Sequence, residues 1–90
     1  MSITVIFPAT NMTEEKYREV LRRLEAAGAG SPPGREFHAC FGTSDSLGVV
    51  DVWTTPEQFE AFGQTLGPIL AEVGVEEAEP QIAKTLNVIA

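Results

Sequence analysis

The sequence predicts one α+β domain in which two helices cover one face of an antiparallel four-stranded sheet. The chain has 90 residues, enough for one small domain. Four short segments are rich in β-branched and aromatic residues. Two longer segments repeat apolar residues every three or four positions, as amphipathic helices do. Along the chain these segments follow the order β-α-β-β-α-β.

The first third of the chain is expected to supply one strand and one helix. Residues 3–7 form a β-rich apolar run that Pro8 closes. Thr13 is a natural N-cap for the helix, and Gly28 is placed to end it. The apolar face of this helix consists of Tyr17, Val20, Leu21, Leu24 and Ala27. Residues 28–34 are a loop by composition.

The middle of the chain is typical of a hairpin that leads into a second helix. Residues 35–41 and 47–53 are its strands, and residues 42–46 turn the chain. The helix begins at Thr55, followed by Pro56 at the first helical position and by the Gln58 of a capping box. Its inner face consists of Phe59, Phe62, Leu66, Ile69, Leu70 and Val73.

The pair Gly67-Pro68 is expected to interrupt the second helix, with a kink or a new short helix there, because proline removes a backbone hydrogen bond. Gly74 ends the helix, and residues 75–80 form an acidic connector. Residues 81–89 are the expected last strand. This order is the split βαβ arrangement of ferredoxin-like domains, and residues 1–90 are expected to form a single such domain.

Charge and composition argue against several classes of function. The net charge of -7 is unsuited to nucleic acid, whose phosphates require clustered basic residues. One cysteine, Cys40, and one histidine, His38, cannot form a disulfide or an ordinary zinc site. No glycine-rich phosphate loop is present, so no metal or cofactor is expected. Without a membrane-spanning run of about 20 apolar residues or a signal peptide, we expect a cytoplasmic protein.

Both faces of the expected sheet are apolar. Ile6 alternates with Val5 in the first strand, and Val50 alternates with Val49 in the third. Two helices cover only one face, and the other face of an isolated domain should be polar. We therefore expect a homodimer that buries the helix-free face against a second copy. A monomer with an exposed apolar face is the alternative.

An acid in the middle of the third strand indicates a site. A hairpin centred near Ser44 and Asp45 would place His38 opposite Asp51 on one face of the sheet. The same register would pair Cys40 with Val49 and Glu36 with Trp53. A slip of one residue would send one strand's side chains to the other face.

On that register, a small-molecule pocket between sheet and helices is expected to contain His38, Asp51 and Trp53 as catalytic residues. Tyr17, Phe59 and Phe62 would close it and contact the substrate. Asp51 would orient His38 and raise its basicity, giving a general base for a phenolic or enolic substrate held against Trp53. Alternatively, His38 and Asp51 are a satisfied buried polar pair and Trp53 belongs to the core. Cys40 is expected to be packing only.

Four segments resemble the antibiotic-biosynthesis-monooxygenase-like branch of the dimeric α/β-barrel superfamily. They are Asp51-Val52-Trp53, residues 57–62, Leu66-Gly67-Pro68 and Asn87-Val88-Ile89. The resemblance implies two ferredoxin-like subunits whose sheets join into a barrel, each with a pocket between sheet and helices. Such proteins include cofactor-independent quinone-forming monooxygenases, haem-degrading enzymes, isomerases and stress-responsive proteins, so the resemblance does not fix one reaction.

The resemblance to haem-degrading relatives is limited to Trp53. Those enzymes also use an asparagine on the first strand and a histidine in the second helix. Here Thr4 and Ile6 stand in the first strand, and Gly63 or Gln64 stands near the histidine's place. The sequence therefore favours a cofactor-independent oxygenase, a cyclase or an isomerase acting on an aromatic or polyketide-like substrate. A non-catalytic ligand-binding or stress-responsive protein is the alternative.

Overall fold

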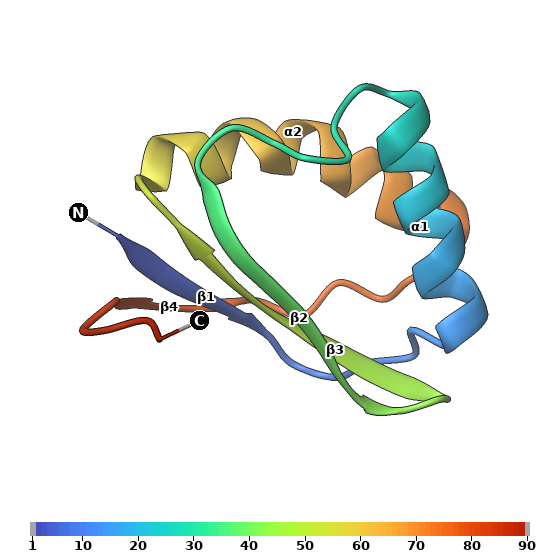
Figure 1. The fold of residues 1–90 in the computed structure, drawn as a ribbon. Helices are drawn as coiled ribbons and strands as arrows, with labels where there is room; N and C mark the ends of the chain where they lie inside the picture. Colours follow the sequence, from blue (N-terminus) through green and yellow to red (C-terminus); the bar gives the residue numbers. More distant parts are fainter. Residues whose placement is uncertain (1, 90) are drawn as a thin grey trace.

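A computed structural model describes residues 2–89 and has the element order that the sequence predicts. The elements are β1 (Ile3–Phe7), α1 (Glu14–Ala26), β2 (Arg35–Thr43), β3 (Ser46–Trp53), α2 (Pro56–Val73) and β4 (Gln81–Lys84). The strands form one antiparallel sheet in the order β2-β3-β1-β4. Both helices lie on the same side of this sheet (Figure 1). The predicted ferredoxin-like fold is confirmed.

Both helices begin at the predicted caps. The Thr13 side-chain oxygen accepts a hydrogen bond from the Lys16 amide at 3.1 Å, and Thr55 does the same for Gln58 at 3.2 Å. Each cap satisfies one of the amides that have no partner within the first turn of a helix. Gly74 ends α2 in the left-handed conformation, with φ +86°, which glycine adopts without strain. Local sequence thus sets where each helix begins.

The predicted interruption of α2 at Pro68 does not start a new helix. One helix continues through Pro68 to Val73, and the expectation of a fresh short helix is wrong. Pro68 lies on the exposed side of α2, so its ring points to solvent and the chain loses one backbone hydrogen bond there. Leu66 and Leu70 stay packed against the core on either side of it, and this packing carries the helix through.

The last strand is shorter than predicted. Pairing ends at Lys84, which lies opposite Ile3, the first residue of β1, so β1 has no further residue to extend the ladder. Residues 85–89 belong to no strand, although the Thr85 amide donates to the Ser2 carbonyl at 3.0 Å. Leu86 is 99% exposed. In Figure 1 this tail turns back beside β4, the edge strand of the sheet.

The register of the β2–β3 hairpin agrees with the prediction at its functional end. His38 lies opposite Asp51, and the turn falls at residues 44–45. One predicted pair is wrong: Trp53 lies opposite Arg35, not Glu36. The cause is a β-bulge between Arg35 and Phe37, which leaves Glu36 as an extra residue without a cross-strand partner.

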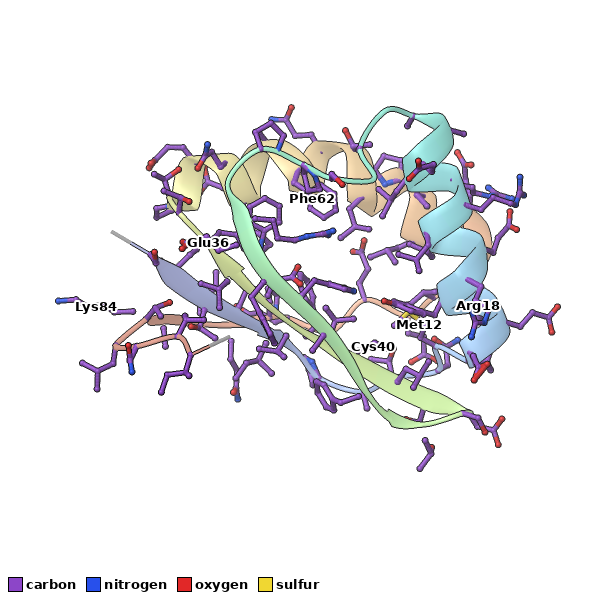
Figure 2. All side chains as sticks on the ribbon, in the orientation of Figure 1. Met12, Arg18, Glu36, Cys40, Phe62 and Lys84 are labelled. Carbon is purple, nitrogen blue, oxygen red and sulfur yellow. The ribbon has the colours of Figure 1, made fainter. Side chains whose placement is uncertain are left out.

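The core fills the space between the sheet and the helices. Its buried apolar side chains are Ile3, Val5, Met12, Val20, Leu24, Trp53, Phe62 and Val75. Figure 2 shows Met12 beneath α1 and Phe62 beneath α2, both on the helix side of the sheet. The opposite face carries the exposed side chains of Ile6, Phe37 and Phe41. Within residues 2–89 no helix has the length and apolar character needed to cross a membrane.

Candidate functional site

A cavity of about 270 Å³ lies between the sheet and the two helices. The sheet contributes Phe7, Arg35, His38, Val49 and Asp51, and the helices contribute Tyr17, Leu24, Phe59, Phe62, Gly63 and Leu66 among others. The segments from Pro8 to Met12 and from Val75 to Pro80 complete the wall. Most of the lining is apolar, with a few polar groups, as is typical of sites for small apolar ligands.

His38 and Asp51 form a hydrogen-bonded pair in the cavity wall. The distance from His38 Nδ1 to Asp51 Oδ1 is 2.6 Å, and only 2% of Asp51 is exposed. A carboxylate this deeply buried needs a donor, and a carboxylate can only accept. Nδ1 of His38 therefore carries a proton and donates it to Asp51. In the neutral ring the other nitrogen, Nε2, is then an acceptor.

The Tyr17 hydroxyl is the hydrogen-bond partner of the acceptor nitrogen of His38. The Tyr17 hydroxyl lies 2.7 Å from His38 Nε2, and the two ring planes are nearly parallel, at 7°. With Nε2 unprotonated, the hydroxyl donates to it. The three side chains thus form a continuous chain of hydrogen bonds from Asp51 through His38 to Tyr17, and all three line the cavity.

The turn between β2 and β3 fixes α1 above His38. The Glu14 amide donates to the Ser44 carbonyl at 2.8 Å, and the Leu47 amide donates to the Met12 carbonyl at 2.8 Å. The Ser46 hydroxyl donates to the Thr10 carbonyl at 2.8 Å. These bonds hold the first turn of α1 against the hairpin. Tyr17 follows one turn later and so lies over the strand that carries His38.

The surroundings of Tyr17 keep its hydroxyl protonated. Burial is the largest influence and raises the pKa of Tyr17, and the charge of Asp51 raises it further. The charges of Arg35 and Arg18 act in the opposite direction. A phenol that holds its proton at neutral pH can donate to His38 and can also pass a proton along the chain.

Trp53 lies in the core behind the cavity wall. Its side chain is fully buried, is not among the residues that line the cavity, and packs against Phe59 and Phe62 with ring-centre distances of 5.8 and 5.1 Å. Its indole N–H has no hydrogen-bond partner in the described part of the chain. The two phenylalanines themselves reach the cavity, so Trp53 supports the rings that line it.

Arg35 lines the cavity and was not among the expected site residues. Its guanidinium carbon lies 5.9 Å from the ring centre of Phe62, and its Nη2 donates to the Gly30 carbonyl at 3.3 Å. Sequence alternation would place Arg35 and His38 on opposite faces of β2, because they are three residues apart. The bulge at Glu36 brings them to the same face. No local sequence signal marks this bulge.

Cys40 does not extend the site, and the described residues form no cluster of metal ligands. Cys40 pairs with Val49, as predicted, and does not line the cavity. Burial raises the pKa of the Cys40 thiol, which keeps it in its less reactive protonated form. Among residues 2–89, no three histidine, cysteine or acidic side chains are grouped as metal ligands would be.

The sequence matches no protein-family model and has no significant match among curated proteins. Similar folds occur among solved structures. One is a candidate antibiotic biosynthesis monooxygenase from Chloroflexus aurantiacus, with a TM-score of 0.69 and 17% identity over 100% of this chain and 98% of the other. Another is SnoaB, a cofactor-independent oxygenase from Streptomyces nogalater, with a TM-score of 0.63 and 16% identity over 98% and 94% of the two chains.

A third similar structure, from Nitrosomonas europaea, is also a candidate antibiotic biosynthesis monooxygenase. Its TM-score is 0.61, at 15% identity over 97% of this chain and 100% of the other. At these identities the similarity establishes the fold. The resemblance noted in the sequence, to the monooxygenase-like branch of the dimeric α/β barrels, is therefore confirmed at the level of fold.

Proposed function

We propose that this protein is a cofactor-independent enzyme that deprotonates a phenolic or enolic aromatic substrate in the cavity. The observation that carries this proposal is the hydrogen-bonded chain of Asp51, His38 and Tyr17 in the wall of an apolar cavity. A general base must lie within hydrogen-bond reach of the proton that it removes. Tyr17 and His38 supply this reach, and the apolar walls suit a flat aromatic ring.

The proton follows the hydrogen bonds. The substrate hydroxyl or acidic C–H gives its proton to the Tyr17 oxygen while Tyr17 gives its own proton to His38 Nε2. Direct transfer to Nε2 is the shorter alternative once a ligand displaces the Tyr17 hydroxyl. His38 then carries protons on both nitrogens, and the buried carboxylate of Asp51 stabilises the resulting cation. Asp51 acts on the substrate only through His38, so it is a positioning residue.

The deprotonated substrate then reacts with molecular oxygen. For an anthrone, the ring CH₂ group loses a proton, the carbanion and O₂ form a peroxide at that carbon, and loss of water leaves a quinone carbonyl. One O₂ is consumed and one water is released for each ring oxidised. The similarity in fold to SnoaB and to two candidate monooxygenases supports this outcome over cyclisation or isomerisation of the same anion.

The proposal is tested with dithranol, an anthrone that is oxidised to the coloured quinone danthron. Wild-type protein should accelerate both oxygen uptake and danthron formation in equal amounts. His38→Gln should reduce the rate by about a hundredfold or more, and Tyr17→Phe and Asp51→Asn should reduce it by tenfold or more. Arg22→Gln, which removes a charge from an exposed ion pair on α1, is the matched control and should leave the rate unchanged.

The non-catalytic alternative has a distinct result in the same experiment. A ligand-binding protein would bind danthron, lose affinity in His38→Gln, and show no acceleration of oxygen uptake above the spontaneous reaction. A rate that His38→Gln does not change would also contradict the proposed role of His38.

A further inference from the structure

We propose that Arg35 holds the anion that forms when a substrate loses its proton in the cavity. This inference rests on the proposed function and adds a residue to it. It also narrows the substrate class to aromatic compounds that enter neutral and carry their negative charge on a ring oxygen. Three features of the structure support it: the backbone that aims Arg35, its unused donors, and the charges around it.

An irregularity in the pairing of β2 with β3 places Arg35 in the wall of the cavity. The bulge between Arg35 and Phe37 makes Glu36 an extra residue, which brings Arg35 opposite Trp53 and onto the face of His38. Figure 2 shows the Glu36 side chain on the other side of β2 from Phe62. Bulges of this kind commonly re-aim a side chain beside a functional site. Without the bulge, an acid would take the place of this cation.

The guanidinium of Arg35 has donors to spare. A guanidinium carries five N–H groups, and the one hydrogen bond that the Arg35 guanidinium makes within residues 2–89 goes to the Gly30 carbonyl. None of the ion pairs of the described chain includes it. Its guanidinium carbon lies within cation–π range of the Phe62 ring, and both side chains line the cavity. The free N–H groups suit an oxyanion, which accepts two of them at once.

The other charges around the cavity favour a neutral compound that becomes an anion inside. Glu76 and Glu77 lie in the segment that closes the wall, and both are exposed. They and the net charge of -7 disfavour a ligand that is already an anion in solution. Tyr17, His38 and Asp51 are the remaining titratable groups of the lining, and α2 contributes none. Arg35 is therefore the one group of this lining that is already a cation before the substrate loses its proton.

The charge of Arg35 already acts inside the site. Burial raises the pKa of the Tyr17 hydroxyl, and the charge of Arg35 lowers it. An oxyanion beside Tyr17 would feel the same favourable field. Because opposite charges within about 4–6 Å lower the pKa of an acid by about 1–3 units, a bound phenol should ionise at a lower pH than the free phenol.

Danthron tests this directly, since its colour changes when a phenol group ionises. Its absorbance is titrated with pH, free and bound to each protein. Wild-type protein should lower the pKa of bound danthron. Arg35→Gln should raise that pKa again by about one unit or more, which corresponds to about a tenfold loss of affinity for the anion. Affinity for neutral danthron should change little, and Arg35→Lys should keep most of the wild-type shift.

Two controls separate a local effect of Arg35 from a general loss of charge and from misfolding. Arg22→Gln removes an equal charge at an exposed site on α1 and should leave the pKa of bound danthron unchanged. Circular dichroism checks the folding of each variant, and Arg35→Met replaces Arg35→Gln if the latter does not fold. A bound danthron pKa that is the same in wild type and Arg35→Gln overturns the role of Arg35. That outcome leaves the proposed function intact, because dithranol oxidation by wild type and its loss in His38→Gln are measured separately.

Discussion

At the scale of single residues, the chain of Asp51, His38 and Tyr17 is open to direct observation. The protein has one tyrosine and one histidine, so a signal from either residue type comes from one side chain. Tyr17 makes its hydrogen bond to Nε2 only with its proton in place, and its surroundings favour that form. Its ionisation therefore reports whether the cavity is as closed as the structure indicates.

Tyr17 should titrate above the ordinary tyrosine value. Burial raises the pKa of Tyr17 above the reference value of 10.0. The phenolate absorbance at about 295 nm should therefore develop at a higher pH in folded protein than in protein unfolded in urea. An equal midpoint in both states would contradict the geometry around Tyr17.

The same shift links Tyr17 to stability. Because the folded pKa is raised, the folded state holds the proton more tightly than the unfolded state. The contribution is fully present below the unfolded value of about 10 and is lost as pH rises through the folded pKa. Urea denaturation should show wild type losing more stability than Tyr17→Phe above about pH 10. Parallel losses in the two proteins would contradict this.

At the scale of elements, α2 leaves space for a ligand at a glycine. Gly63 lies inside the helix and lines the cavity, and a Cβ placed on it would meet nothing within 4 Å. Glycine in a helix interior is less stable than alanine by about 1 kcal/mol. The helix thus tolerates a less stable residue at a position where a methyl group would project into the cavity.

Gly63→Ala should therefore change stability and binding in opposite directions. The variant should unfold at higher urea concentration, by up to about 1 kcal/mol in free energy, and should bind danthron about tenfold more weakly. Glu60→Ala, at an exposed position of the same helix, should leave binding unchanged. If Gly63→Ala binds danthron as wild type does, the ligand does not lie against this part of α2.

The elements show which features local sequence can predict. Thr13, Thr55 and Gly74 fix helix ends through contacts within a few residues, and the alternation of β3 fixes its two faces, so these were predicted correctly. The turn at residues 44–45 then sets His38 opposite Asp51. Pairing near the turn follows from local geometry, and the central pair of the site could be predicted for that reason.

The features that sequence did not predict depend on distant contacts. The bulge at Glu36 lies at the far end of β2, where pairing with Trp53 and the bond from the Thr54 amide to the Gly34 carbonyl fix the backbone. For this reason the sequence analysis did not identify Arg35 as a residue of the site. The end of β4 depends on where β1 begins, and the continuity of α2 through Pro68 depends on packing on both sides. The position of Trp53 in the core, which the sequence analysis gave as an alternative, depends on its packing against Phe59 and Phe62.

At the scale of the whole molecule, the helix-free face of the sheet carries exposed apolar side chains that a second copy of the chain could cover. Ile6, Phe37 and Phe41 are 36%, 41% and 44% exposed on that face, which no helix covers. Burying such a face stabilises an assembly by about 25 cal/mol for each Å² of apolar surface. We propose a homodimer formed through this face, as the sequence analysis expected.

Light scattering at micromolar concentration should give the mass of a dimer. Phe41→Glu, which places a charge in the proposed interface, should shift the protein towards monomer or reduce its solubility, while Glu60→Gln on the outer side of α2 should not. A stable, folded wild-type monomer at that concentration would contradict the proposed dimer.

The central claim is that a ligand in the cavity gives its proton to His38, and nitrogen-15 NMR of His38 tests it most directly. In the free protein, Nδ1 should carry the proton and Nε2 should not. When danthron is added at a pH where free danthron is neutral, its absorbance should change to that of the anion, and both nitrogens of His38 should become protonated. Danthron that binds in its neutral form beside an unchanged His38 would contradict the account.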